Sequence, residues 1–312
     1  MLSLERQSRL RYTHPYSVFL LRRLFRIFPL SILFVVVVCS FRLPLGHLES
    51  RAFLPAQFTP ITVFSNFLLI QNLTASESVL DPLWSLPYEV QMCLVLPLLF
   101  GLAIASEGIT ALLLLWAAAC LGSIALGAAG LPTALLRYTP CFLAGVVGYR
   151  VAIRSARQWP TPVWPLMLLA ITVAYLLFPV DAVGWVCCLG VGLLIPQVRE
   201  LGEGYLRESC RLVARYSYGV YVSHAVLIWL AFDELATWPL VARWSLFAVT
   251  TVVVPVALYH AIEAPLIALG RRLVRRRFQR RPLAMARGRM SLRAELLRAR
   301  CESKVLFGSR VP

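Results

Sequence analysis

The sequence is poor in charge, and poorest in acidic residues. Only 15% of its 312 residues are charged, and 15 acidic residues face 31 Lys and Arg. Soluble domains carry about 25% charged residues, so this composition argues against a soluble protein. The apolar share of 59% and the mean hydropathy of +0.73 point the same way. The composition therefore indicates an integral membrane protein.

Sequence features of several common protein classes are also missing. The chain has only four His, and its eight Cys show no metal-ligand spacing. It has no Gly-rich phosphate loop, no esterase-type nucleophile elbow and no inverted repeat of the kind typical of many transporters. We therefore expect no metal site and no permanently bound cofactor.

Apolar runs long enough to enter a bilayer follow one another along the chain. A spanning helix needs about 20 predominantly apolar residues. We count eight such runs, at residues 17–40, 84–105, 108–128, 135–153, 163–180, 183–198, 215–232 and 243–266. The predicted fold is all-α, a polytopic transmembrane helix bundle of about eight spans.

The net charge of +16 suggests a nucleic-acid partner at first, but the positions of the basic residues argue against one. With eight spans and the N-terminus inside, 27 of the 31 Lys and Arg fall on the inner side. This distribution follows the positive-inside rule and predicts that both termini are cytoplasmic. We expect a cytoplasmic segment (1–16), a membrane domain (17–268) and a basic cytoplasmic tail (269–312) that contacts anionic lipid.

The longest outer segment, residues 41–83, contains the apolar stretch "ITVFSNFLLIQNL". No other predicted outer loop is of comparable length. We expect this stretch either to lie along the outer membrane surface or to re-enter the membrane.

An acidic residue, Glu89, lies inside the second apolar run, in "DPLWSLPYEVQMCLVLPLLF". Ser85 is predicted to cap a helix whose positive end stabilises this carboxylate near the outer face. Two interpretations remain: an interfacial acid paired with a neighbour, or a charged group lining a substrate path. Ionisable residues inside spans are usually functional, which favours the second.

Three arginines, Arg22, Arg23 and Arg26, lie in the first span, in "FLLRRLFRIFP". Arg23 and Arg26 are three residues apart, so their guanidinium groups can point the same way at the cytoplasmic mouth of the span. Two guanidinium groups in this arrangement can bind phosphate through bidentate hydrogen bonds. The alternative is a pair of arginines that snorkel to the inner interface.

Two later stretches contain histidine. In "SYGVYVSHAVLIW", helical spacing places Ser217, Tyr221 and His224 on one face, and His224 is either a partnered core group or a proton carrier. In "HAIEAP", Pro265 is expected to close the final span, with Glu263 paired to Arg271 or Arg272.

Taken in order, these stretches resemble the acyltransferase 3 family, polytopic membrane O-acyltransferases of the O-antigen acetylase type. The resemblance covers residues 16–276 and four motifs. They are Arg-x-x-Arg at Arg23 and Arg26; Trp-Ser-Leu-x-x-Glu with Pro-Leu-Leu at Trp84, Ser85, Leu86, Glu89 and Pro97–Leu99; Ser-Tyr-x-x-Tyr-x-x-His at Ser217, Tyr218, Tyr221 and His224; and Glu-x-Pro at Glu263 and Pro265.

The resemblance implies transfer of an acyl group, commonly acetyl, from acyl-CoA to a hydroxyl of a carbohydrate acceptor or exported glycan, in the bacterial inner membrane. Its implied partners are the lipid bilayer, acyl-CoA as co-substrate and the carbohydrate. The implied roles are acyl-CoA binding for the two arginines, catalysis for Glu89 and His224, and acceptor binding for Trp84 and Tyr221. The alternatives are a non-catalytic membrane protein and a transporter or flippase of a lipid-linked saccharide.

One departure from the family pattern concerns the start of the chain. Family members usually begin with two further helices, the first of which carries a basic residue and a histidine thought essential for transfer. This chain opens at the family's third helix, and neither His14 nor His47 matches that histidine. Three explanations are open: a shortened gene model, a truncated inactive protein, or a reassigned base such as His224.

Overall fold

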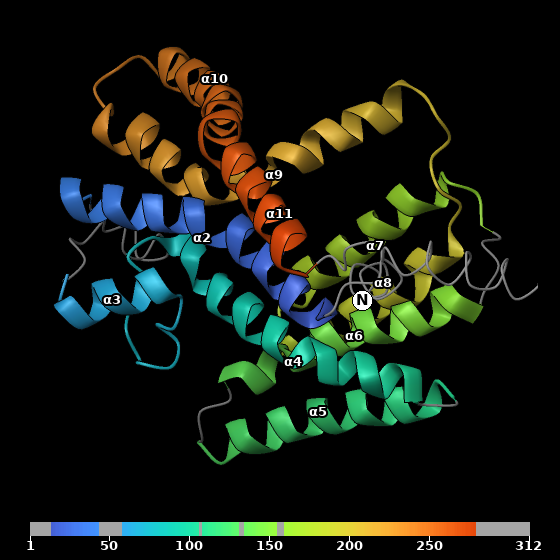
Figure 1. Ribbon diagram of the computed structural model, residues 1–312. Helices are drawn as coiled ribbons and strands as arrows, with labels where there is room; N and C mark the ends of the chain where they lie inside the picture. The colour runs from blue at the N-terminus through green and yellow to red at the C-terminus, as the bar shows by residue number, and fades with distance from the viewer. Residues whose placement is uncertain (1–13, 44–57, 106–107, 131–133, 155–158, 279–312) are drawn as a thin grey trace, which may run out of the picture.

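The computed structural model describes residues 14–43, 58–105, 108–130, 134–154 and 159–278, which form helices and no β-strand (Figure 1). The α-helices are α2 (Pro15–Phe41), α3 (Pro60–Leu68), α4 (Leu86–Ala105), α5 (Thr110–Ala128), α6 (Ala134–Arg154), α7 (Val163–Leu177), α8 (Asp181–Leu194), α9 (Tyr205–Trp229), α10 (Leu240–Leu258) and α11 (Ala264–Phe278). The 3₁₀-helices η2 (Asp81–Ser85) and η3 (Ile195–Gln197) and the π-helical turns η4 (Leu230–Glu234) and η5 (Tyr259–Glu263) connect them. The all-α prediction is confirmed.

Each of the eight predicted apolar runs overlaps a helix. Within the described ranges, four helices are long and apolar enough to cross a membrane, by length and composition: Pro15–Phe41, Asp81–Leu102, Thr110–Ala128 and Leu240–Phe278. Both α7, with 15 residues, and α8, with 14, are shorter than the span of about 20 residues that a bilayer requires. The number of spans and the side of the termini stay predictions, and the segments before residue 14 and after residue 278 lie outside the described residues.

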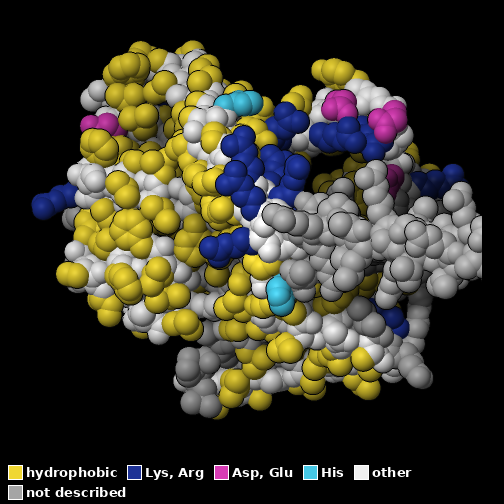
Figure 2. Space-filling model, viewed as in Figure 1, with side chains coloured by type: hydrophobic (Ala, Val, Ile, Leu, Met, Phe, Trp, Pro, Cys, Tyr) yellow, Lys and Arg dark blue, Asp and Glu magenta, His cyan; other side chains and the backbone are white. Residues whose placement is uncertain are grey.

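Apolar side chains cover much of the molecular surface (Figure 2). Val241, Leu98 and Leu176 are 79%, 75% and 70% exposed. Soluble monomers rarely expose contiguous apolar surface on this scale, whereas lipid solvates it without cost. Basic side chains gather over α11, whose last turn contains Arg275–Arg277 (Figure 2).

The central helix is α2, which packs against α3, α4, α9 and α11 (Figure 1). Its residues Val35 and Val38 share a fully buried core with Val222 of α9. The segment that follows α3 enters the same core, because Leu80 and Leu83 have no exposed surface. The two placements expected for the stretch at residues 61–73, along the outer membrane surface or re-entering the membrane, both stay predictions.

A buried asparagine holds the segment that follows α3. The Asn66 amide nitrogen donates to the carbonyl oxygens of Thr62 and Glu77, at 2.9 and 2.8 Å, and its carbonyl oxygen accepts from the Val79 N–H at 3.1 Å. Since Asn66 is only 1% exposed, these bonds replace water that it cannot reach. The bonds to Glu77 and Val79 hold α3 against the segment that leads into α4.

Glycines allow two pairs of helices to approach closely. A Cβ on Gly192 of α8 would lie 2.3 Å from the Ala144 carbonyl oxygen of α6, and one on Gly148 would lie 2.5 Å from the Gly192 carbonyl oxygen. A Cβ on Gly270 would lie 2.8 Å from the Phe25 ring, where α11 crosses α2. Small residues at such crossings are typical of helix packing in membranes.

The helix at the end of the last predicted span continues past Pro265. It runs through η5 into α11, which is described as far as Phe278, and where the membrane span closes stays a prediction. In the described part of the chain Glu263 forms no ion pair, so the expected pair with Arg271 or Arg272 is wrong. Those residues follow eight and nine positions later, about 12 Å farther along a continuous helix. Glu263 is instead buried, with 2% exposure.

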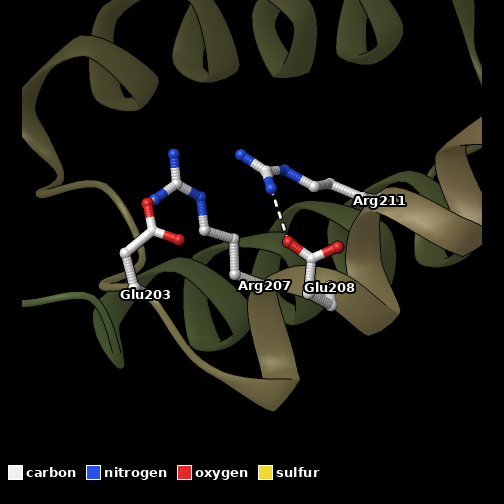
Figure 3. Close-up of polar contacts among 4 residues, drawn as sticks. All are labelled: Glu203, Arg207, Glu208 and Arg211. Carbon is white, nitrogen blue, oxygen red and sulfur yellow. Dashed lines mark hydrogen bonds and ion pairs between the residues drawn. The ribbon is translucent and has the colours of Figure 1, made fainter.

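The first turns of α9 carry two ion pairs (Figure 3). Glu203 pairs with Arg207, and Glu208 pairs with Arg211 at 2.5 Å. Each pair joins residues three or four positions apart, which contributes a few tenths of a kcal/mol to a helix. Both pairs lie at the start of α9, which begins at Tyr205, ten residues before the apolar run predicted at 215, and they bring no distant segments together.

Candidate active site

A cavity of about 660 Å³ lies where α2, the start of α4 and the middle of α9 meet. We call it the arginine cavity. Its lining residues come from three of the four stretches that the sequence singled out: Arg23, Arg26, Ile27, Ser85, Leu86, Glu89, Ser217, Tyr218 and Tyr221. The structure thus brings together side chains separated by up to about two hundred positions in the chain.

The first pair in the cavity is Arg23 and Glu89. Arg23 Nη1 lies 3.0 Å from Glu89 Oε1, and the side chains are 40% and 38% exposed. We expected these residues at opposite mouths of the bundle, and that placement is wrong. Glu89 lies in the first turn of α4 and Arg23 more than two turns into α2, and the two helices bring the side chains into direct contact.

The second arginine has a different environment. Arg26 is exposed, lines the cavity and forms no ion pair with any described residue. The charge of Arg26 acts on the buried Glu263, but its N–H donors form no hydrogen bond to a described residue, whereas Arg23 already shares one with Glu89. Of the two arginines, Arg26 is the stronger candidate for anion binding.

Hydroxyl groups form the remaining polar wall. The Tyr221 hydroxyl donates to the Pro82 carbonyl oxygen at 2.5 Å, and Ser85 Oγ lies 2.6 Å from the Tyr221 hydroxyl. The Tyr218 hydroxyl donates to the Ile27 carbonyl oxygen at 2.6 Å. Ser85 was expected to cap α4, and this expectation is wrong. The 3₁₀-helix η2 runs directly into α4, and the Ser85 side chain bonds to Tyr221 of α9 instead.

Two predicted site residues lie outside the lining of the cavity. His224 is half-buried, and its Nδ1 lies 2.6 Å from the Tyr221 carbonyl oxygen of its own helix. Trp84 is 47% exposed and its ring centroid lies 5.8 Å from that of Tyr138 and 6.4 Å from that of Tyr88. The roles of His224 and Trp84 stay predictions, while Arg23, Arg26, Glu89 and Tyr221 share one cavity.

Ser85 and Tyr218 were not predicted as polar groups of the site. A signal for Ser85 was present, because it precedes Glu89 by four residues and so lies on the same helical face. No such signal existed for the Tyr218 bond to Ile27, which joins two helices. No group of three or more His, Cys, Asp and Glu that could hold a metal ion occurs among the described residues.

The family model of the acyltransferase domain matches residues 2–260. The chain belongs to the acyltransferase 3 family. This confirms the resemblance drawn from the four motifs, and with the long apolar helices it identifies the chain as a membrane acyltransferase. All residues that line the arginine cavity fall inside the matched range. Comparisons with curated proteins and with solved structures gave no match.

Proposed function

We propose that this acyltransferase transfers an acyl group, commonly acetyl, from acyl-CoA to a hydroxyl of a carbohydrate acceptor or exported glycan in the bacterial inner membrane. The arginine cavity is the site of transfer. The observation that supports this is the presence in one cavity of a free guanidinium, a half-exposed carboxylate and two bonded hydroxyls. These are the groups that a phosphate-bearing donor and an alcohol acceptor require.

Arg26 holds the donor. Acyl-CoA carries phosphates, and a guanidinium binds phosphate through two parallel hydrogen bonds. Arg23 supports this role with its remaining N–H groups and fixes Glu89 at the same time. The two arginines of one motif therefore have different tasks.

Glu89 receives the acceptor. In the transfer the acceptor hydroxyl oxygen forms a bond to the thioester carbonyl carbon, the carbon–sulfur bond breaks, and the hydroxyl proton ends on the coenzyme A sulfur. Glu89 Oε1 accepts from Arg23, which leaves Oε2 to take that proton as a general base. His224 is the other candidate base, but Glu89 is the one that lines the cavity.

Tyr221 and Trp84 contact different parts of the acceptor. Tyr221 lies in the cavity wall. Trp84, half-exposed beside Tyr88 and Tyr138, offers an aromatic face to a sugar ring outside the cavity. This arrangement suits an acceptor longer than one sugar.

The test is the Arg26→Ala variant in reconstituted membranes supplied with acetyl-CoA and a glycan acceptor. Transfer is measured as release of coenzyme A thiol and as the mass gain of one acetyl group on the glycan. We expect loss of transfer with normal membrane insertion. The matched control is Arg211→Ala, an exposed arginine of α9 outside the cavity, which should keep transfer. Undiminished transfer in Arg26→Ala contradicts the proposal.

A further inference from the structure

The hydrogen positions in the hydroxyl pair of the cavity wall follow from its bonding. The Pro82 carbonyl oxygen can only accept, so the Tyr221 hydroxyl must donate its one hydrogen to it, across 2.5 Å. The Tyr221 oxygen then has only lone pairs left. The 2.6 Å contact with Ser85 therefore requires that Ser85 donates to Tyr221.

Ser85 consequently presents no hydrogen to the cavity. Its single hydrogen is used in the bond to Tyr221, so toward a ligand it offers only lone pairs. A serine nucleophile needs its hydrogen bonded to a base, and a tyrosine hydroxyl that already donates to a carbonyl is not one. Ser85 is thus a hydrogen-bond acceptor for a ligand and not an acyl carrier.

A second acceptor lies one helical turn away. Glu89 follows Ser85 by four residues, and both line the cavity. Side chains at this spacing are about 5–6 Å apart at their Cβ atoms. Because Glu89 Oε1 accepts from Arg23, Oε2 is the carboxylate oxygen left for a ligand. The wall therefore offers two neighbouring acceptors, and the ligand that complements them carries two neighbouring donors.

We propose that the arginine cavity selects acceptors with two hydroxyls on adjacent carbons, a vicinal diol. One hydroxyl donates to Ser85 and fixes the ring, while its neighbour donates to Glu89 and is acylated. The acylated oxygen gains the bond to the carbonyl carbon, the carbon–sulfur bond breaks, and the proton passes through Glu89 to the departing sulfur. This inference rests on the proposed function and names Ser85 as the residue that positions the acceptor.

The experiment compares acceptors that differ by one hydroxyl. The probes are methyl glycosides of gluco, manno and galacto configuration and their monodeoxy analogues, with acetyl-CoA as donor. We expect the wild type to prefer at least one diol over its monodeoxy analogue about tenfold in kcat/KM, the effect of one hydrogen bond. Ser85→Ala should abolish that preference by lowering kcat/KM for the diol alone, and Ser85→Thr should restore it.

A structural role for Ser85 predicts a different pattern. If Ser85→Ala lowers kcat/KM equally for the diol and the monodeoxy acceptor, or if the wild type shows no preference for any diol, the inference is overturned. Thr250→Ala, which removes a hydroxyl of α10 bonded to its own helix, is the matched control and should keep the preference. A covalent adduct at Ser85 after treatment with a fluorophosphonate also overturns the inference, since it requires an activated serine.

Binding measurements separate failure of this inference from failure of the proposed function. Isothermal titration of the purified protein with the same glycosides needs no turnover. A diol preference that Ser85→Ala removes, found in a protein that releases no coenzyme A thiol, supports the diol site and refutes the transferase proposal. Thiol release together with equal binding of diol and monodeoxy ligands refutes the diol site alone. If the protein binds none of the glycosides, the diol site is overturned too.

Discussion

Replacing Gly192 by alanine tests the close approach of α6 and α8. The new Cβ would lie 2.3 Å from the Ala144 carbonyl oxygen and 2.9 Å from its carbonyl carbon. Both are backbone atoms, so no side chain can turn away, and the helices must separate by about 1 Å to reach an ordinary contact of about 3.5 Å. Overpacking of this kind costs about 1–3 kcal/mol of unfolding free energy.

Gly190 supplies the matched control, because a Cβ there meets nothing within 4 Å. Both replacements gain the helix propensity of alanine over glycine, about 1 kcal/mol, so the difference between the variants isolates the contact. In domains of 150–250 residues about 1 kcal/mol shifts the melting temperature by 2–4 °C. We therefore expect Gly192→Ala to melt roughly 2–12 °C below Gly190→Ala.

The assay is thermal unfolding in detergent micelles, followed by far-ultraviolet circular dichroism. Gly148→Ala should show the same loss as Gly192→Ala, because its Cβ would lie 2.5 Å from the Gly192 carbonyl oxygen. The double variant should lose less than the sum, since one separation of the helices relieves both contacts. Equal melting temperatures for Gly192→Ala and Gly190→Ala would refute this packing.

Three further substitutions probe the site and the helix that supports it. Glu89→Gln keeps the shape of the side chain but removes the proton acceptor, so kcat should fall about 10²–10⁴-fold with acetyl-CoA affinity kept; unchanged kcat would remove Glu89 from catalysis. Arg26→Lys retains charge without the planar fork, so we expect a raised KM for acetyl-CoA with little change in kcat, and an unchanged KM would count against a phosphate contact. Gly270→Ala forces the Phe25 ring aside and should lower the melting temperature, and adding Phe25→Ala, which opens the space, should raise it again. If the double variant melts no higher than Gly270→Ala alone, the strain lies elsewhere.

The helical segments were predictable because the signal for them is local. Runs of about 20 apolar residues form helices in lipid whatever their partners, since each backbone group must be bonded within the segment. The four motifs were equally visible, and their order alone indicated the family. Three of them contribute side chains to the arginine cavity.

The errors arose where partners are distant in sequence. The bond between Ser85 and Tyr221 joins residues 136 positions apart, so a capping role was the only local interpretation of Ser85. The end of the last span was placed at Pro265 because proline usually ends helices, yet Pro265 lies in the first turn of α11 and the helix continues past it. The contact between Arg23 and Glu89 joins residues 66 positions apart, which no local pattern reveals.

The hydrogen bonds of Asn66 have a consequence for how variants of this protein behave. Asn66 does not line the arginine cavity, but its bonds to Glu77 and Val79 hold α3 against the segment that leads through η2 into α4, the helix that carries Glu89. A substitution at Asn66 would therefore resemble a substitution in the active site, because Glu89 would be intact but displaced from Arg23.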